Sequence, residues 1–182
     1  MKYSKIAGFI KHSCQLTIWD TPSEQWISDG QAAYPMFASP KMDEKQMLHR
    51  LELPEDKISV RRGLPPEAVD LSNNTDDEEL IGKTGPVILY RGELCRTYYT
   101  SMGALAVPDR YIQVVEKDES KGEMMLYLRI FLNTPYIALH KGMYLYGIVL
   151  ACPIYKDPVL ENAFAELSRN LGVARTNFGR VE

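Results

Sequence analysis

Short runs of β-branched and aromatic residues, separated by clusters of turn-forming residues, fill most of the second half of this chain. From residue 87 to residue 152 this pattern predicts successive strands. Residues 13–36 repeat it and predict an N-terminal β-meander that turns at Ser28-Asp29-Gly30. Tight turns join antiparallel neighbours, so we expect a mostly antiparallel, strongly twisted β-sheet.

Two segments carry helical signals instead. Over residues 40–52 a short apolar stripe predicts a helix of about three turns, with either Ser39 or Asp43 as its N-cap. A second helix is predicted to begin after Asp157, with Pro158 at its first position. One face of that helix is apolar, with Leu160, Ala163, Phe164, Leu167 and Leu171 at helical spacing. It should pack on the sheet, which makes the expected fold class α+β.

The chain divides into three parts by composition. Residues 1–58 hold the N-terminal β-meander and the short helix, and residues 87–182 hold a β-rich core with the C-terminal helix. Residues 59–86 have little periodicity and contain the acidic run DDEE, so we expect a long, mobile connection there. The three parts suit one compact domain, because 182 residues is an ordinary length for a single domain.

Two segments resemble each other within the chain. The sequences SDGQAAYP (28–35) and SMGALAVP (101–108) share Ser-x-Gly-x-x-Ala-x-Pro. Leu16 and Leu89 each lie fourteen residues before the shared glycine. This similarity indicates two related hairpin units in which the turn is constant and Asp29 is replaceable. It favours a structural role for Asp29 over a catalytic one.

Composition excludes several classes of protein. The net charge of −3 argues against a dedicated duplex-DNA binder. Three isolated cysteines without a CxxC pair fit a reducing compartment better than a disulfide framework. The N-terminus lacks the apolar run of a signal peptide, and the longest apolar run, 143–152, is about half of a membrane span. We expect a cytoplasmic protein without membrane contact.

Sequence motifs for common cofactors and catalytic groups are absent. No GxGxxG, GxxxxGK[ST] or GxSxG stands in the chain, and its three histidines lack HxH, HxxxH or HExxH spacing. We therefore expect no cofactor and no metal site. The remaining catalytic hypothesis is a small hydrolase that uses cysteine or aspartate chemistry. Its candidates are a His12–Cys14 pair on one strand face, Cys95 near a cation, and Asp20 with Asp29.

Tyrosine is the most unusual component, with eleven residues against five phenylalanines and two tryptophans. Many of the tyrosines stand beside arginines on the predicted strands, and together they are our candidate binding residues. Those residues are Tyr90, Arg91, Arg96, Tyr98, Tyr99, Arg110, Tyr111, Tyr127 and Arg129. Tyrosine and arginine are enriched where proteins bind each other. Tyrosine also has high β-propensity without any binding role.

Three hypotheses follow. The first is a non-enzymatic binding or accessory module of a bacterium or mobile element, which contacts a protein partner, including another copy of itself, through a Tyr/Arg-rich sheet face. The second is weak binding of single-stranded nucleic acid, whose bases stack on aromatic rings between basic side chains. The third is the hydrolase. The first accounts best for a chain without a catalytic signature.

Overall fold

The computed structural model describes residues 3–67, 69–117, 122–131, 134–154 and 166. The described helices are α1 (Tyr3–Ser13), α2 (Glu44–Arg50) and α3 (Asp109–Glu116). The strands are β1 (Gln15–Asp20), β2 (Gln25–Ser28), β3 (Ala32–Pro35), β4 (Ser59–Gly63), β5 (Glu79–Leu80), β6 (Lys83–Tyr90), β7 (Glu93–Thr100), β8 (Gly103–Pro108), β9 (Met124–Phe131), β10 (Thr134–Lys141), β11 (Tyr144–Leu150) and β12 (Cys152–Pro153).

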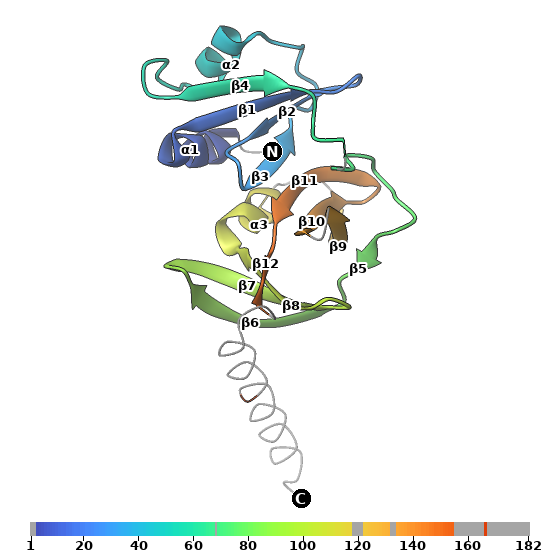
Figure 1. The fold of residues 1–182 in the computed structure, drawn as a ribbon. Coiled ribbons are helices and arrows are strands. Elements are labelled where there is room, and N and C mark those ends of the chain that lie inside the picture. The colour runs from blue at the N-terminus through green and yellow to red at the C-terminus, as the bar shows by residue number, and fades with distance from the viewer. Residues whose placement is uncertain (1–2, 68, 118–121, 132–133, 155–165, 167–182) are drawn as a thin grey trace, which may run out of the picture.

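The strands form two sheets, one with the order β4-β1-β2-β3-β11-β10-β9-β5 and one with the order β12-β8-β7-β6 (Figure 1). All neighbouring strands are antiparallel except β1 and β4. This confirms the predicted mostly antiparallel α+β fold. The helix expected after Asp157 lies, apart from Glu166, outside the described residues.

The larger sheet buries both of its faces. Ile18 and Ile27, opposite each other on β1 and β2, point into the main core, which also takes in the apolar sides of the three helices. Trp26 and Ile148 belong to a second cluster, on which Val69 and Leu71 pack from outside the sheet. Successive side chains along a strand point to opposite faces of the sheet, so they pack into two separate hydrophobic clusters.

The segment from β11 to β12 pairs with both sheets. β11 pairs with β3 in the larger sheet, through Ile148 opposite Ala33. After Ala151 the chain continues as β12, whose Cys152 pairs with Ala106 of β8 in the smaller sheet. Each of the two meanders, β1-β2-β3 and β6-β7-β8, thus receives its last neighbour from the same segment (Figure 1).

The two similar segments both contribute to hairpins, but their turns differ. Gly30 lies between β2 and β3, where Ser28 pairs with Ala33, whereas Gly103 is the first residue of β8 and pairs with Thr100. Both glycines have a positive φ, 92° and 99°, in the region that favours glycine. Pro35 and Pro108 end β3 and β8. The similarity in sequence therefore does not correspond to two hairpins of the same register.

The predicted helix at 40–52 is confirmed but shorter, as α2. Of the two candidate caps the structure uses Asp43: its carboxylate accepts from the Gln46 amide at 2.8 Å, and the Gln46 side chain accepts from the Asp43 amide at 3.0 Å. These reciprocal bonds form a capping box. Pro54 lies beyond the helix, whose C-cap is Leu51.

Two helices were not predicted: α1 precedes the predicted β-meander, and α3 stands where a strand was expected. Residues 3–13 form α1, which buries Ile6, Ala7 and Ile10 at helical spacing. Residues 109–116 form α3, although valine and isoleucine favour strands. The buried residues of this segment are spaced as on one face of a helix: Tyr111, Ile112, Val114 and Val115. Arg110 and Tyr111 are therefore helical rather than on a strand.

The segment expected to be an unstructured connection also differs from expectation. Residues 59–63 form β4, which runs parallel to β1 with Val60 opposite Leu16. β5 and the start of β6 lie further along the same segment. The strand signal was missed because only Val60 of β4 is half-buried and the rest of the strand is exposed.

Candidate functional site

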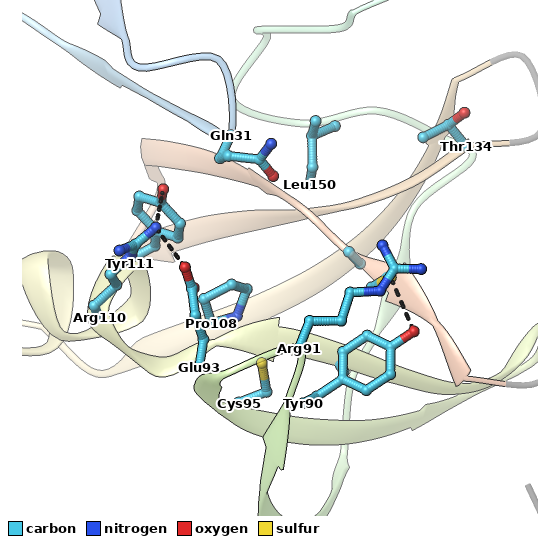
Figure 2. Close-up of a pocket in the computed structure, with 13 residues that line it drawn as sticks. Gln31, Tyr90, Arg91, Glu93, Cys95, Pro108, Arg110, Tyr111, Thr134 and Leu150 are labelled. Atoms are coloured by element: carbon cyan, nitrogen blue, oxygen red, sulfur yellow. Dashed lines mark hydrogen bonds and ion pairs between the residues drawn. The ribbon is translucent and has the colours of Figure 1, made fainter. Parts of the chain in front are cut away.

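A cavity of about 440 Å³ opens between the tip of the β6–β7 hairpin, the start of α3 and the β11–β12 junction (Figure 2). Four of the nine predicted binding residues line it: Tyr90, Arg91, Arg110 and Tyr111. The two arginines stand on either side of the view in Figure 2, with Glu93 nearer Arg110. We call this space the arginine cavity.

The hairpin tip positions the first tyrosine–arginine pair. Arg91 and Gly92 both have positive φ, 51° and 82°, as a two-residue turn between twisted strands requires. Arg91 is exposed, and its guanidinium carbon lies 5.2 Å from the centre of the Tyr90 ring. The Tyr90 hydroxyl and the Cys152 sulfur lie 3.7 Å apart, and this contact together with burial raises the pKa of Tyr90.

The second pair is held by a chain of hydrogen bonds. Arg110 donates to the Tyr111 hydroxyl at 2.9 Å, and that hydroxyl donates to the Asp29 carboxylate at 2.7 Å. A salt bridge of 3.0 Å links Arg110 to Glu93. The guanidinium also lies over two aromatic rings, 4.7 Å from the centre of Tyr111 and 5.6 Å from that of Phe9. Arg110 is thus fixed in place.

One polar atom of this arrangement has no partner among the described residues. The Arg110 Nε group is buried and makes no hydrogen bond there, whereas Nη2 bonds both Tyr111 and Glu93. Among the described residues that line the cavity, Glu93 is the only carboxylate, against two guanidinium groups. The Asp29 carboxylate lies behind this lining, bonded to the Tyr111 hydroxyl. The lining itself therefore holds one more positively than negatively charged side chain.

Neither Cys95 nor Cys14 is placed as an activated nucleophile. Cys95 is 3% exposed, and burial raises the pKa of its thiol. Cys14 is exposed, and its thiol donates to the Lys11 carbonyl at 3.6 Å. His12 lies on α1 and Cys14 after it, so the expected pair on one strand face is not formed.

Asp29 has a structural role at the β2–β3 turn. It is 7% exposed, and its Oδ1 accepts from the amides of Gln31 and Ala32, each at 3.0 Å. Its Oδ2 accepts from the Tyr111 hydroxyl, so one carboxylate is hydrogen-bonded both to the turn and to a side chain of α3. The second hairpin, with Met102 at the matching position, has no such link. Asp29 is a turn residue that also orders the cavity.

Replacing Asp29 by asparagine should destabilise the protein by about 1 kcal/mol, because a charge-assisted bond from Tyr111 becomes a neutral one while the amide contacts can persist. Urea denaturation of the wild type and Asp29→Asn measures the difference. Asp43→Asn, which keeps a good N-cap on α2, is the matched control and should change stability by a few tenths of a kcal/mol. Equal effects of the two substitutions would contradict a special role for the Tyr111 contact.

The remaining predicted binding residues do not join the cavity. Arg96 is bound by Asp109 at 2.5 Å and by Glu116 at 2.7 Å, which fixes α3 on the smaller sheet. Tyr98 is 1% exposed, and burial raises its pKa to about 12. Tyr99 packs on the opposite face of that sheet, with the cluster around Cys95. The expectation that the nine residues share one sheet face is therefore wrong.

Arg129 and Tyr127 lie at a different place, on β9. Arg129 is 2% exposed; it forms a 2.6 Å salt bridge with Glu78 and donates to the carbonyls of Asp70 and Ser72 at 2.9 and 3.0 Å. These bonds hold the acidic 64–78 segment against the larger sheet. Tyr127 meets the His140 ring edge-on at 4.8 Å. Arg129 thus explains why an acidic segment without periodicity is ordered.

The buried His140 makes stability depend on pH. Burial and the neighbouring Arg129 lower its pKa below the usual 6.5, while Glu78 raises it. The folded state then favours the neutral ring, so its contribution to stability is complete above about pH 6.5 and is lost as the pH falls below it. Urea midpoints at about pH 7 and pH 5 should therefore differ more for the wild type than for His140→Gln. His49→Gln, at an exposed position of α2, should keep the wild-type difference.

Sequence reasoning missed several residues of the cavity. Glu93 and Gln31, which line it, and Phe9, whose ring lies under the Arg110 guanidinium, carried no signal because their roles depend on distant contacts. In the described part of the chain no three His, Cys, Asp or Glu side chains are grouped to hold a metal ion. No described helix is long and apolar enough to cross a membrane. Comparison with protein-family models, curated proteins and solved structures finds no match to this chain.

Proposed function

We propose that this chain is a non-enzymatic binding module whose partner is another protein, and that the partner places a carboxylate in the arginine cavity. The observation that carries the proposal is that Arg91 and Arg110 line one cavity, in which Glu93 is the single carboxylate among the described lining residues. Guanidinium groups bind carboxylates through paired, directional hydrogen bonds.

The chemistry of the cavity supports binding rather than catalysis. The Cys95 thiol has a raised pKa, which keeps it protonated and poorly nucleophilic. The Asp29 carboxylate is occupied by two amides and a tyrosine hydroxyl. Tyrosine and arginine side chains that are already held in place lose little conformational freedom when a partner binds, which favours affinity.

The proposal predicts which peptides the protein selects. The full chain is panned against a displayed library of random dodecapeptides, and the selected peptides are labelled and titrated by fluorescence anisotropy. We expect enrichment of aspartate and glutamate. Arg110→Gln should weaken binding about tenfold or more, the equivalent of one charge-assisted hydrogen bond. Glu93→Gln should strengthen it, because the competing carboxylate is gone.

Controls separate binding from folding. Arg61→Gln, on the exposed strand β4, removes a positive charge away from the cavity and should leave the affinity unchanged. Thermal unfolding of each variant checks that the fold persists. Selected peptides without acidic residues, or equal affinities for the wild type and Arg110→Gln, would overturn the proposal.

Two parallel measurements identify other partners. Labelled oligothymidine is titrated at low and high salt: salt-sensitive binding that Arg110→Gln abolishes, with no peptide selected, would replace this proposal by single-stranded nucleic-acid binding. Size-exclusion chromatography with light scattering tests self-association. A dimer that Arg91→Gln and Arg110→Gln dissociate would identify the protein partner as a second copy of the chain.

A further inference from the structure

A second cavity adjoins the first and differs from it in chemistry. It has a volume of about 210 Å³ and lies on the outer face of the larger sheet. Its wall includes Trp19, Ala33, Tyr136 and Ile148, and Val69 of the 64–78 segment closes it from outside. None of the described residues that line it carries a charge. We call it the apolar cavity.

The two cavities share a wall that is one residue pair thick. Gln31 and Leu150 line both of them. The Leu150 amide donates to the Gln31 carbonyl at 2.9 Å, so a backbone hydrogen bond holds these two residues together between the cavities. We call this residue pair the partition. In Figure 2 the two side chains stand together at the edge of the arginine cavity. Leu150 is 41% exposed, so the partition reaches the surface.

We infer that the two cavities together recognise a short bipartite segment of the partner protein, with an acidic side chain in the arginine cavity and a large apolar side chain in the apolar cavity. The two side chains are close neighbours in the partner's sequence, because only Gln31 and Leu150 separate their sites. This inference rests on the proposed function and adds the second half of the recognition motif.

A peptide fits these cavities better than a free carboxylic acid with a long alkyl chain does. The apolar cavity is about half the size of its neighbour and suits one side chain. In an extended peptide, nearby side chains project at fixed spacing from a backbone that can cross a polar partition. The side-chain amide of Gln31 lies at that partition and can form hydrogen bonds with such a backbone. An alkyl chain offers no group for it.

Filling the apolar cavity tests the inference. Thr17 lines it and is half-buried on β1, so Thr17→Phe should occupy the space without touching the arginine cavity. Thr84→Phe, at an exposed position of β6, is the matched control for an added surface ring. Wild-type selection from the dodecapeptide library should give acidic peptides with a leucine, methionine or aromatic residue nearby. Thr17→Phe should lose the apolar preference, keep the acidic one and bind the wild-type peptides about tenfold more weakly.

The outcomes distinguish the two proposals. If acidic peptides are selected without an apolar preference, or if Thr17→Phe binds like Thr84→Phe, the bipartite motif is overturned and the arginine cavity alone remains. If no acidic peptides are selected, the proposed function fails and the motif with it. Laurate is titrated as a competitor. Displacement of a labelled peptide by laurate in the wild type but not in Thr17→Phe, without an apolar preference among peptides, would assign the paired cavities to a fatty acid instead.

Discussion

Replacing Arg129 by methionine is expected to destabilise the fold by about 3 to 5 kcal/mol, the cost of leaving a buried charge without its partner. Methionine keeps much of the side-chain volume but has no donors. Glu78, whose side chain is 11% exposed, and the carbonyls of Asp70 and Ser72 would then lose their hydrogen bonds. The 64–78 segment should detach from the larger sheet. Urea denaturation measures the loss, and limited proteolysis should cut this segment first.

Two further variants show whether the uncompensated charge is the cause. Arg62→Met breaks an exposed ion pair with Asp20 and should leave the urea midpoint close to that of the wild type. The double variant Arg129→Met with Glu78→Met removes both charges and should recover part of the lost stability. An Arg129→Met protein within about 1 kcal/mol of the wild type would show that water reaches Glu78 and that the pair is not a structural centre.

Replacing Gly147 by alanine is the second large effect that we expect, at about 2 to 3 kcal/mol. A methyl group there would lie 2.7 Å from Cδ1 of Tyr34 and 3.1 Å from the Ala33 carbonyl oxygen. The Tyr34 ring cannot yield easily, since it is 1% exposed and its hydroxyl donates to the Tyr111 carbonyl at 2.9 Å. The clash should therefore push β3 and β11 apart and disturb α3. Thermal and urea unfolding measure it.

Gly8→Ala provides a control of opposite sign. Gly8 lies inside α1, and a methyl group there meets nothing within 4 Å. Alanine in a helix interior is favoured over glycine by up to about 1 kcal/mol, so this variant should be more stable than the wild type. A Gly147→Ala protein with wild-type stability would mean that the two strands separate slightly without cost at this point.

The features of the fold that depend on neighbouring residues in the chain were predictable from the sequence. The turn at Gly30, the turn after Tyr90 and the capping box of Asp43 and Gln46 all depend on residues a few positions apart. α3 was missed for the opposite reason. Its β-branched residues favour a strand locally, and only burial between two sheets makes it a helix.

The candidate site was only partly predictable. Tyrosine and arginine enrichment selected Tyr90, Arg91, Arg110 and Tyr111, which line the cavity, but it also selected Arg129, whose side chain is buried against Glu78. Composition does not distinguish an arginine that lines a cavity from one that is buried in an ion pair inside the protein. That difference depends on contacts between residues distant in sequence, such as the bond from Tyr111 to Asp29.

The segment that runs from β11 through Ala151 to β12 has a consequence for how the protein is made. A ribosome releases β3 and β8 long before it releases their partners at Ile148 and Cys152. Until then each meander presents an unpaired strand edge, which is the kind of surface through which nascent chains aggregate. Pairings between such distant residues are also slow to form. This protein should therefore complete its fold only after β11 and β12 have been synthesised, and should need protection by chaperones until then.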